Sequence, residues 1–316
     1  MQERQLTLGI VGFPYGGNGG TSSETPDIRQ WQSRVILQAM ADKRISPNIW
    51  LKDFSDTPIT MTRNRAVVEA RKAGVDVLIM VDSDMKPDCE KGSPEFFPTS
   101  FDFIYKHWDK GPSVVCAPYC GPPPDECVYV FRWHQHGNNK NDLYWKLEMY
   151  GREEAALMKG IQSCAAQPTG LIMFDMRAFD LTDPQKTYDA LLKKGKSVGE
   201  AQRLAQGWFY YEWGDVHASE KASTEDVTAT RDISMAGILE LGYSPIYVNW
   251  DCWAGHWKPK CVTKPQIIYA DQVNEKYREA VMRSVNMGER IVNLEVPPEL
   301  RKRQPPDEGT AVPLAP

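Results

Sequence analysis

Residues 75–84, VDVLIMVDSD, constrain the fold of this chain more than any other segment. Six of the seven residues before Asp82 are apolar, and an apolar strand without alternation is typical of a sheet that is covered on both faces. The preceding residues, 60–74, have helical spacing and end at Gly74, a common stop signal for a helix. Together these features predict an α/β fold in which helices flank a mostly parallel, Rossmann-like central sheet.

The same patterns extend along most of the chain. Further strands are expected at residues 6–13, within 46–54, and at 113–118, 170–176 and 243–251. Further helices are expected at residues 31–40, 98–110, 182–206, 224–241 and 265–290. Residues 120–141 and 207–224 are predicted as loops from their composition. The tail 296–316, rich in proline and charge, is predicted to be extended or disordered.

Charge and hydropathy argue against several classes of protein. The net charge is −5, so no strongly basic nucleic-acid surface is expected, although a local patch stays open. No apolar run reaches the roughly 18 residues of a membrane span, and the first residues lack the order of a signal peptide. Seven cysteines at irregular spacing indicate reduced thiols. The protein is therefore expected in the cytoplasm, with no membrane partner.

Asp82, Ser83 and Asp84 stand where the apolar strand ends. Open α/β sheets bind their ligands at the carboxyl ends of the strands, and two carboxylates so close together can share Mg²⁺ or Mn²⁺. A nucleoside diphosphate is a natural companion of that cation, which stabilises it as a leaving group. The simpler alternative is a solvated turn capped by two aspartates.

The segment around this triplet, ITMTRNRAVVEARKAGVDVLIMVDSDMKPD, resembles the core of GT-A glycosyltransferases. In that family an Arg-Asn pair, here Arg63 and Asn64, opens the helix before the strand that ends in the D-x-D motif. Residues 168–180, 223–232 and 249–259 are similar to the family's later motifs and follow in the same order. The resemblance spans roughly residues 6–260 as an ordered set.

This resemblance implies a GT-A fold in one domain at 1–295, with a nucleotide-binding half at 1–118, an acceptor-binding half at 119–262 and the helix at 265–290. It implies a glycosyltransferase that moves a hexose or pentose from a UDP- or GDP-sugar to a hydroxyl acceptor, with Mn²⁺ or Mg²⁺ as cofactor. Donor contacts are implied for Asp82, Ser83 and Gly170, the last in a strand that lines the sugar pocket. Arg63 and Asn64 are also assigned to the donor. An arginine at a helix start can bind phosphate or a base edge, or it can lie on a solvated helix face.

His256 matches the metal-binding histidine that follows the family's last strand. With Asp82 and Asp84 it would complete a ligand set of two carboxylates and one imidazole, which suits Mn²⁺. The alternative is a packed or surface histidine between Trp253 and Trp257.

Glu225 and Asp226 are the candidate catalytic carboxylates. Sugar transfer requires the acceptor hydroxyl to lose a proton, which a carboxylate can accept. In inverting relatives the second acid of this motif has that role, so Asp226 is the expected base and Glu225 the expected partner of a sugar or acceptor hydroxyl. The alternative is that both acids only complement the helix dipole.

Weaker candidates surround these motifs. Pro14 and Tyr15 follow the first strand, where relatives hold the nucleoside, and Asp53 or Asp56 could recognise the base. Trp208 and Trp213 are expected to contact the acceptor, because aromatic faces stack on sugars and bases. Ordinary packing is the alternative for these aromatic residues. Five residues match no common zinc module, so their binding of a metal stays open: Cys116, Cys120, Cys127, His134 and His136.

Two other functions compete with glycosyl transfer. A sugar-nucleotide nucleotidyltransferase should have a basic glycine-rich loop after the first strand, but residues 14–27 contain no Lys or Arg. A binding module with a decayed site is disfavoured by the complete set Asp82, Asp84, Asp226 and His256. The acceptor stays open between a protein, a glycan, a small molecule and a hydroxylated base in DNA, as in phage DNA-modifying transferases.

Overall fold

A computed structural model describes residues 4–14, 26–55, 58–121, 127–136, 144–214 and 221–256. The chain divides into two compact units, Met1–Gly121 with Cys127–Trp257, and Pro122–Glu126 with Lys258–Pro316. Every described residue belongs to the first unit. Tyr15, Asp56, the predicted helix 265–290 and the tail 296–316 lie outside the described residues.

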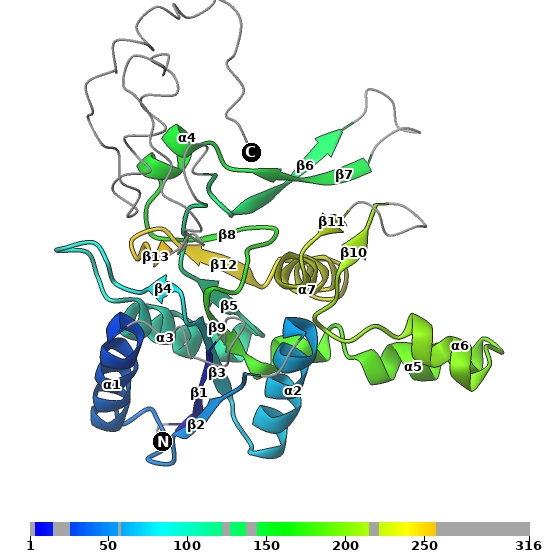
Figure 1. Ribbon diagram of the computed structural model, residues 1–316, viewed down its shortest axis with the longest axis horizontal. Coiled ribbons are helices and arrows are strands. Elements are labelled where there is room, and N and C mark those ends of the chain that lie inside the picture. The colour runs from blue at the N-terminus through cyan, green and yellow to red at the C-terminus, as the bar shows by residue number, and fades with distance from the viewer. Residues whose placement is uncertain are drawn as a thin grey trace, which may run out of the picture. The chain divides into compact units, whose positions relative to one another are not determined.

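A central sheet forms the middle layer of this unit (Figure 1). Its seven strands are β1 (Leu8–Phe13), β2 (Trp50–Asp53), β3 (Val77–Asp82), β5 (Val114–Cys116), β8 (Ile161–Ser163), β9 (Leu171–Asp175) and β12 (Ile246–Asn249), in the order β2-β1-β3-β9-β5-β12-β8. Strand β9 is antiparallel to both β3 and β5, and β8 is antiparallel to β12. The other five strands therefore run the same way, which confirms the predicted α/β fold with a mostly parallel sheet.

Helices cover both faces of the sheet and explain why β3 is apolar along its length. Leu78 and Met80 of β3 pack in one cluster with α2 (Ile59–Lys72) and α7 (Glu225–Leu241). Val77, Ile79 and Val81 pack in a second cluster with α1 (Pro26–Ala41) and α3 (Phe96–His107). Successive strand residues point to opposite faces, so a strand between two helical layers has no polar face.

The remaining helices are short. One precedes the predicted loop 120–141, and the other four lie between it and the predicted loop 207–224. They are η1 (Trp108–Lys110), α4 (Arg152–Leu157), η2 (Met176–Asp180), α5 (Pro184–Lys193) and α6 (Val198–Leu204). The predicted helix 182–206 is thus two helices, because Gly195 adopts a φ of 80° and Ser197 starts α6 with a capping box. No helix in the described ranges is long and apolar enough to cross a membrane.

Two predicted loops contain strands. β6 (Phe131–His136) pairs with β7 (Tyr144–Met149) in an antiparallel hairpin, so the loop prediction for 120–141 is wrong at residues 131–136. The hairpin is anchored by Trp133, whose indole donates to Ser234 at 3.0 Å, a contact that local composition does not reveal. β10 (Glu212–Trp213) and β11 (Lys221–Ser223) likewise form a short ribbon within the predicted loop 207–224.

Candidate active site

The D-x-D turn and His256 are brought together by a pair of two-residue strands. β13 (Gly255–His256) follows β12 and pairs with β4 (Met85–Lys86), which follows the D-x-D triplet, so that His256 lies opposite Met85. Since β3 and β12 run in the same direction, both segments leave the sheet at its carboxyl edge. This edge is where open α/β sheets bind ligands.

Asp84 and His256 form the first half of the site. The Nε2 atom of His256 lies 3.2 Å from Oδ2 of Asp84, and its Nδ1 atom lies 3.4 Å from the carbonyl oxygen of Cys120. The ring also packs edge-on against Tyr119, with centroids 5.0 Å apart. A neutral imidazole has only one N–H, so when Nδ1 donates to Cys120 the Nε2 lone pair faces the Asp84 carboxylate.

Two such donor atoms that converge fit a divalent cation. An imidazole nitrogen and a carboxylate oxygen are ligands that Mn²⁺ accepts, and cations of this kind often complete their coordination with substrate phosphates. Among the residues that the structure describes, no three His, Cys, Asp or Glu side chains gather closely enough to hold a metal. The protein would therefore contribute Asp84 and His256, and the role of Asp82 as a third ligand stays a prediction.

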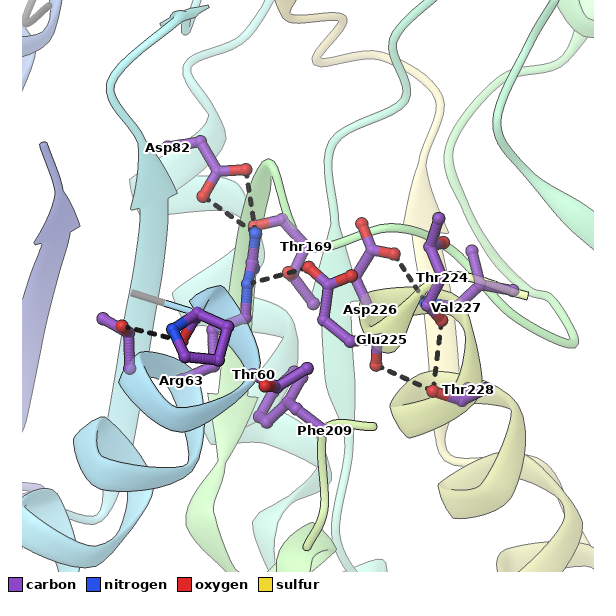
Figure 2. Close-up of polar contacts among 12 residues, drawn as sticks. Thr60, Arg63, Asp82, Thr169, Phe209, Thr224, Glu225, Asp226, Val227 and Thr228 are labelled. Atoms are coloured by element: carbon purple, nitrogen blue, oxygen red, sulfur yellow. Dashed lines mark hydrogen bonds and ion pairs between the residues drawn. The ribbon is translucent and has the colours of Figure 1, made fainter. Parts of the chain in front are cut away.

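Arg63 forms the second half of the site, and Figure 2 shows its guanidinium between two carboxylates. Its Nη2 atom lies 3.0 Å from each carboxylate oxygen of Asp82, and its Nε atom lies 3.6 Å from Oε1 of Glu225. The guanidinium carbon also lies 5.1 Å from the centre of the Phe13 ring. Arg63 is only 2% exposed, because α2 turns this position toward the sheet. The solvated helix face considered for Arg63 is therefore wrong.

The charges of this cluster act on one another. Desolvation raises the pKa of Asp82 to about 6, with Asp84 and Asp226 adding to the rise and Arg63 opposing it. Burial likewise raises the pKa of Tyr119 well above its usual value, and the negative charges of Asp226 and Asp82 contribute. Both effects place Asp226 electrostatically in the same cluster as the D-x-D motif.

Glu225 and Asp226 occupy the first turn of α7, as predicted. Glu225 is buried against Arg63, whereas Asp226 is partly exposed and accepts a hydrogen bond from the Val227 amide at 2.9 Å. Thr224 holds the N-cap position, but its side chain makes no cap hydrogen bond. Its carbonyl oxygen accepts from the hydroxyl of Thr228 instead.

Asn64 and Gly170 support the site by packing. The Asn64 amide donates to the carbonyl oxygen of Phe209 at 2.8 Å and accepts from its N–H at 3.1 Å. It thereby ties α2 to the segment before the acidic motif. A Cβ atom on Gly170 would lie 2.9 Å from both Met85 and Tyr119, so a side chain there would displace the wall of the site. Direct contacts of Asn64 and Gly170 with a donor stay predictions.

Pro14 and Asp53 lie at the carboxyl ends of β1 and β2. Asp53 accepts from Arg29 at 3.3 Å and borders a cavity of about 410 Å³ that α1 also lines. Gly12 faces the same carboxylate, and a Cβ there would clash with it. The position is compatible with the predicted nucleoside contacts, which stay predictions.

The two predicted acceptor tryptophans differ in their surroundings. The Trp208 indole donates to the carbonyl oxygen of Phe179 at 2.9 Å, and Arg71 lies over its ring at 4.8 Å. Trp213 is 50% exposed, and its ring lies 6.2 Å from that of Tyr211. Trp208 is therefore held by neighbouring residues, whereas Trp213 is half exposed. Their contacts with an acceptor stay predictions.

Sequence reasoning assigned no role to Tyr119, and it considered Tyr211 only as a loop residue that could stack on a sugar or base. Tyr119 lies after β5 at the same sheet edge, between Gly170 and His256, so the strand-end rule could have indicated it. The Tyr211 hydroxyl is hydrogen-bonded to Glu225, and burial, followed by the charge of Glu225 and this hydrogen bond, raises the pKa of Tyr211. No local pattern predicts which aromatic residue of a loop turns toward the acidic motif.

The candidate zinc residues do not form a cluster of three in the described part of the chain. Cys116 is buried in the sheet. Desolvation raises the pKa of its thiol, and the nearby Cys164 adds a smaller contribution. The side chain of His134 lies on the β6–β7 hairpin, where its Nδ1 atom is 3.3 Å from Glu148.

No protein-family model matches this chain, and no curated protein matches it. Several solved structures share parts of the fold at low identity. A197 from STIV is similar over 80% of this chain and 86% of its own, with 13% identity and a TM-score of 0.38. GalNAc-T7, crystallised with UDP, GalNAc and Mn²⁺, is similar over 81% of this chain and 44% of its own, with 13% identity and a TM-score of 0.36.

A third structure is a Bacillus anthracis protein described as a glucose-1-phosphate thymidylyltransferase, in complex with sucrose. It is similar over 63% of this chain and 82% of its own, with 8% identity and a TM-score of 0.31. At such scores the function of this chain has to be inferred from its own residues.

Proposed function

We propose that this protein is a metal-dependent glycosyltransferase that moves a sugar from a nucleotide-sugar donor to a hydroxyl acceptor. The observation that carries the proposal is the carboxylate cluster at the carboxyl edge of the sheet. Asp82 and Glu225 share the buried Arg63, Asp84 faces His256, and Asp226 lies at the start of α7 beside them.

The nucleotide-sugar donor is proposed to bind beside Asp84, His256 and Asp82. A divalent cation bound by Asp84 and His256 would offset the charge of a diphosphate. The ion pair with Arg63 holds the Asp82 carboxylate at a fixed position. Charges fixed in this way stabilise a transition state better than solvent-exposed ones, because they need not reorient during the reaction. Pro14 and Asp53 at the ends of β1 and β2 are the proposed nucleoside contacts.

The hydroxyl acceptor is proposed to bind beside Asp226. In the proposed step the bond between the anomeric carbon and the diphosphate oxygen breaks, and its electron pair leaves with the diphosphate. The acceptor oxygen forms the new bond to the anomeric carbon, and its proton passes to the Asp226 carboxylate. Glu225 is buried, ion-paired with Arg63 and hydrogen-bonded to Tyr211, so we propose the more exposed Asp226 as the base.

Product analysis tests this function directly. Incubation with a panel of UDP- and GDP-sugars and Mn²⁺ should release the nucleoside diphosphate, slowly to water and faster when a hydroxyl acceptor is present. A chelator should stop the release. Pyrophosphate formation from a nucleoside triphosphate and a sugar phosphate, without turnover of any nucleotide sugar, would instead identify a sugar-nucleotide nucleotidyltransferase.

A further inference from the structure

A second cleft lies outside the site described above. It has a volume of about 740 Å³, within the roughly 300–1,000 Å³ of small-molecule sites. Residues 90–94 after the D-x-D turn form one wall, residues 250–253 after β12 form the second, and α4 with Met158 and Lys159 forms the third.

The cleft and the candidate active site share a wall. Cys120 lines the cleft, and its carbonyl oxygen is the atom that faces Nδ1 of His256. Trp253 also lines the cleft, three residues before His256, and its carbonyl oxygen accepts from Cys89 at 3.4 Å. A ligand in this cleft would therefore lie next to the residues that carry the metal pair.

Aromatic and ionic side chains line the cleft together. Trp250 and Trp253 have ring centroids 5.9 Å apart, and Trp253 is only partly buried, so part of its indole surface faces the cleft. The negative face of an indole ring attracts the weakly positive C–H bonds of a pyranose. A sugar ring is thus a suitable occupant for this wall.

The charged groups of the lining suit hydroxyl groups better than phosphates. Two cations, Arg152 and Lys159, stand beside three carboxylates, Glu90, Glu153 and Asp251, which leaves one net negative charge. Carboxylates accept hydrogen bonds from hydroxyl groups, and the ammonium group of Lys159 donates to them. A polyanion such as DNA would meet the repulsion of the excess carboxylate, because nucleic-acid affinity depends on cations placed against phosphates.

We propose that this cleft binds a neutral saccharide, whose distal sugar rests on Trp253 while its hydroxyl groups bond to Asp251, Glu153 and Lys159. The further statement that this saccharide is the acceptor rests on the proposed function. Binding itself does not, because none of the lining side chains named here belongs to the metal pair or to the acidic motif.

Saccharide binding is measured on the full chain by saturation-transfer NMR, in EDTA and without nucleotide. The probes are maltose, cellobiose, lactose, mannobiose and N-acetylchitobiose. At least one should bind. Trp253→Ala removes the stacking face, and the double variant Glu153→Gln with Asp251→Asn removes two charged hydrogen-bond acceptors. Each should weaken that binding at least about tenfold. The double variant keeps the test valid if Trp253→Ala fails to fold. Trp145→Ala, at a 60% exposed tryptophan on β7, is the matched control and should bind like the wild type.

Three results would overturn the inference. No probe binds, or the bound probe keeps its affinity in both cleft variants, or an oligonucleotide with hydroxymethylated bases binds and loses affinity in Trp253→Ala. Release of nucleoside diphosphate from nucleotide sugars is measured separately. Saccharide binding without such release would support the saccharide site and contradict the proposed function. Release without saccharide binding would support the proposed function and contradict the saccharide site.

Discussion

At the scale of single residues, the site depends on how one buried arginine is shared. Arg63 forms ion pairs with both Asp82 at the end of β3 and Glu225 at the start of α7, two acids that come from distant parts of the chain. Asp84 faces His256, and Asp226 is partly exposed in the first turn of α7. The four acids therefore have different surroundings although they carry the same chemical group, and the roles proposed for them follow this difference.

Asp226→Asn separates catalysis from binding. The substitution keeps the size of the side chain but removes the base, so the rate of sugar transfer should fall by about 10² to 10⁴ while donor affinity stays nearly unchanged. Transfer kinetics and donor titration measure the two quantities. Glu240→Gln, an exposed change near the other end of α7, should alter neither. A wild-type transfer rate in Asp226→Asn would show that Asp226 is not the base and only complements the dipole of α7.

Arg63→Met tests the buried ion pairs. Removing the guanidinium leaves Asp82 and Glu225 without their shared cation, and breaking a buried pair typically costs about 3–5 kcal/mol. The free energy of unfolding in denaturant should fall accordingly. Arg65→Met, two positions along α2 on the exposed side, should change it by less than about 0.5 kcal/mol. Equal effects of the two substitutions would show that Arg63 has no special structural part.

The sequence predicts which residues belong to the candidate site, but not which partners all of their side chains contact. Asp82 and Asp84 were predicted as site residues from their place at a strand end, and Glu225, Asp226 and His256 from the resemblance to GT-A glycosyltransferases. The bonds of Asn64 to Phe209 span 145 residues. Such partners depend on tertiary packing, which no local pattern contains.

At the scale of elements, long strands and helices were predictable and short ones were not. β3 is an uninterrupted apolar run, and α2 has a helical period over many residues. β4 and β13 have two residues each, too few for any period, and they exist because the segments after β3 and β12 leave the sheet side by side. The β6–β7 hairpin was missed because its polar residues resemble those of a loop.

The two glycines Gly242 and Gly199 test the helix boundaries. Gly242 ends α7 with a φ of 81°, so alanine there should destabilise the protein by about 1–2 kcal/mol, the cost of a left-handed backbone with a side chain. Gly199 lies inside α6 with open space around it, and alanine there should stabilise by about 0.5 kcal/mol. Thermal unfolding measures both, and a destabilising Gly199→Ala would contradict the assignment of α6.

At the scale of the whole molecule, the account requires that donor binding, metal binding and folding be linked. A ligand that binds only the folded chain stabilises it, by about 2.7 kcal/mol at a concentration 100 times its dissociation constant. The residues that would hold the cation, Asp84 and His256, come from segments 172 residues apart in the chain. Donor binding should therefore stabilise the fold that joins these two segments.

The most direct measurement is the melting temperature of the full chain with UDP or GDP, with and without Mn²⁺. One of the two nucleotides should raise the melting temperature by several degrees when Mn²⁺ is present and far less in EDTA, and Asp84→Ala should lose this metal-dependent rise. Asp109→Ala, at an exposed aspartate paired only with Arg4 among the described residues, should keep it. The account would be contradicted by the same rise in EDTA, or by an undiminished rise in Asp84→Ala.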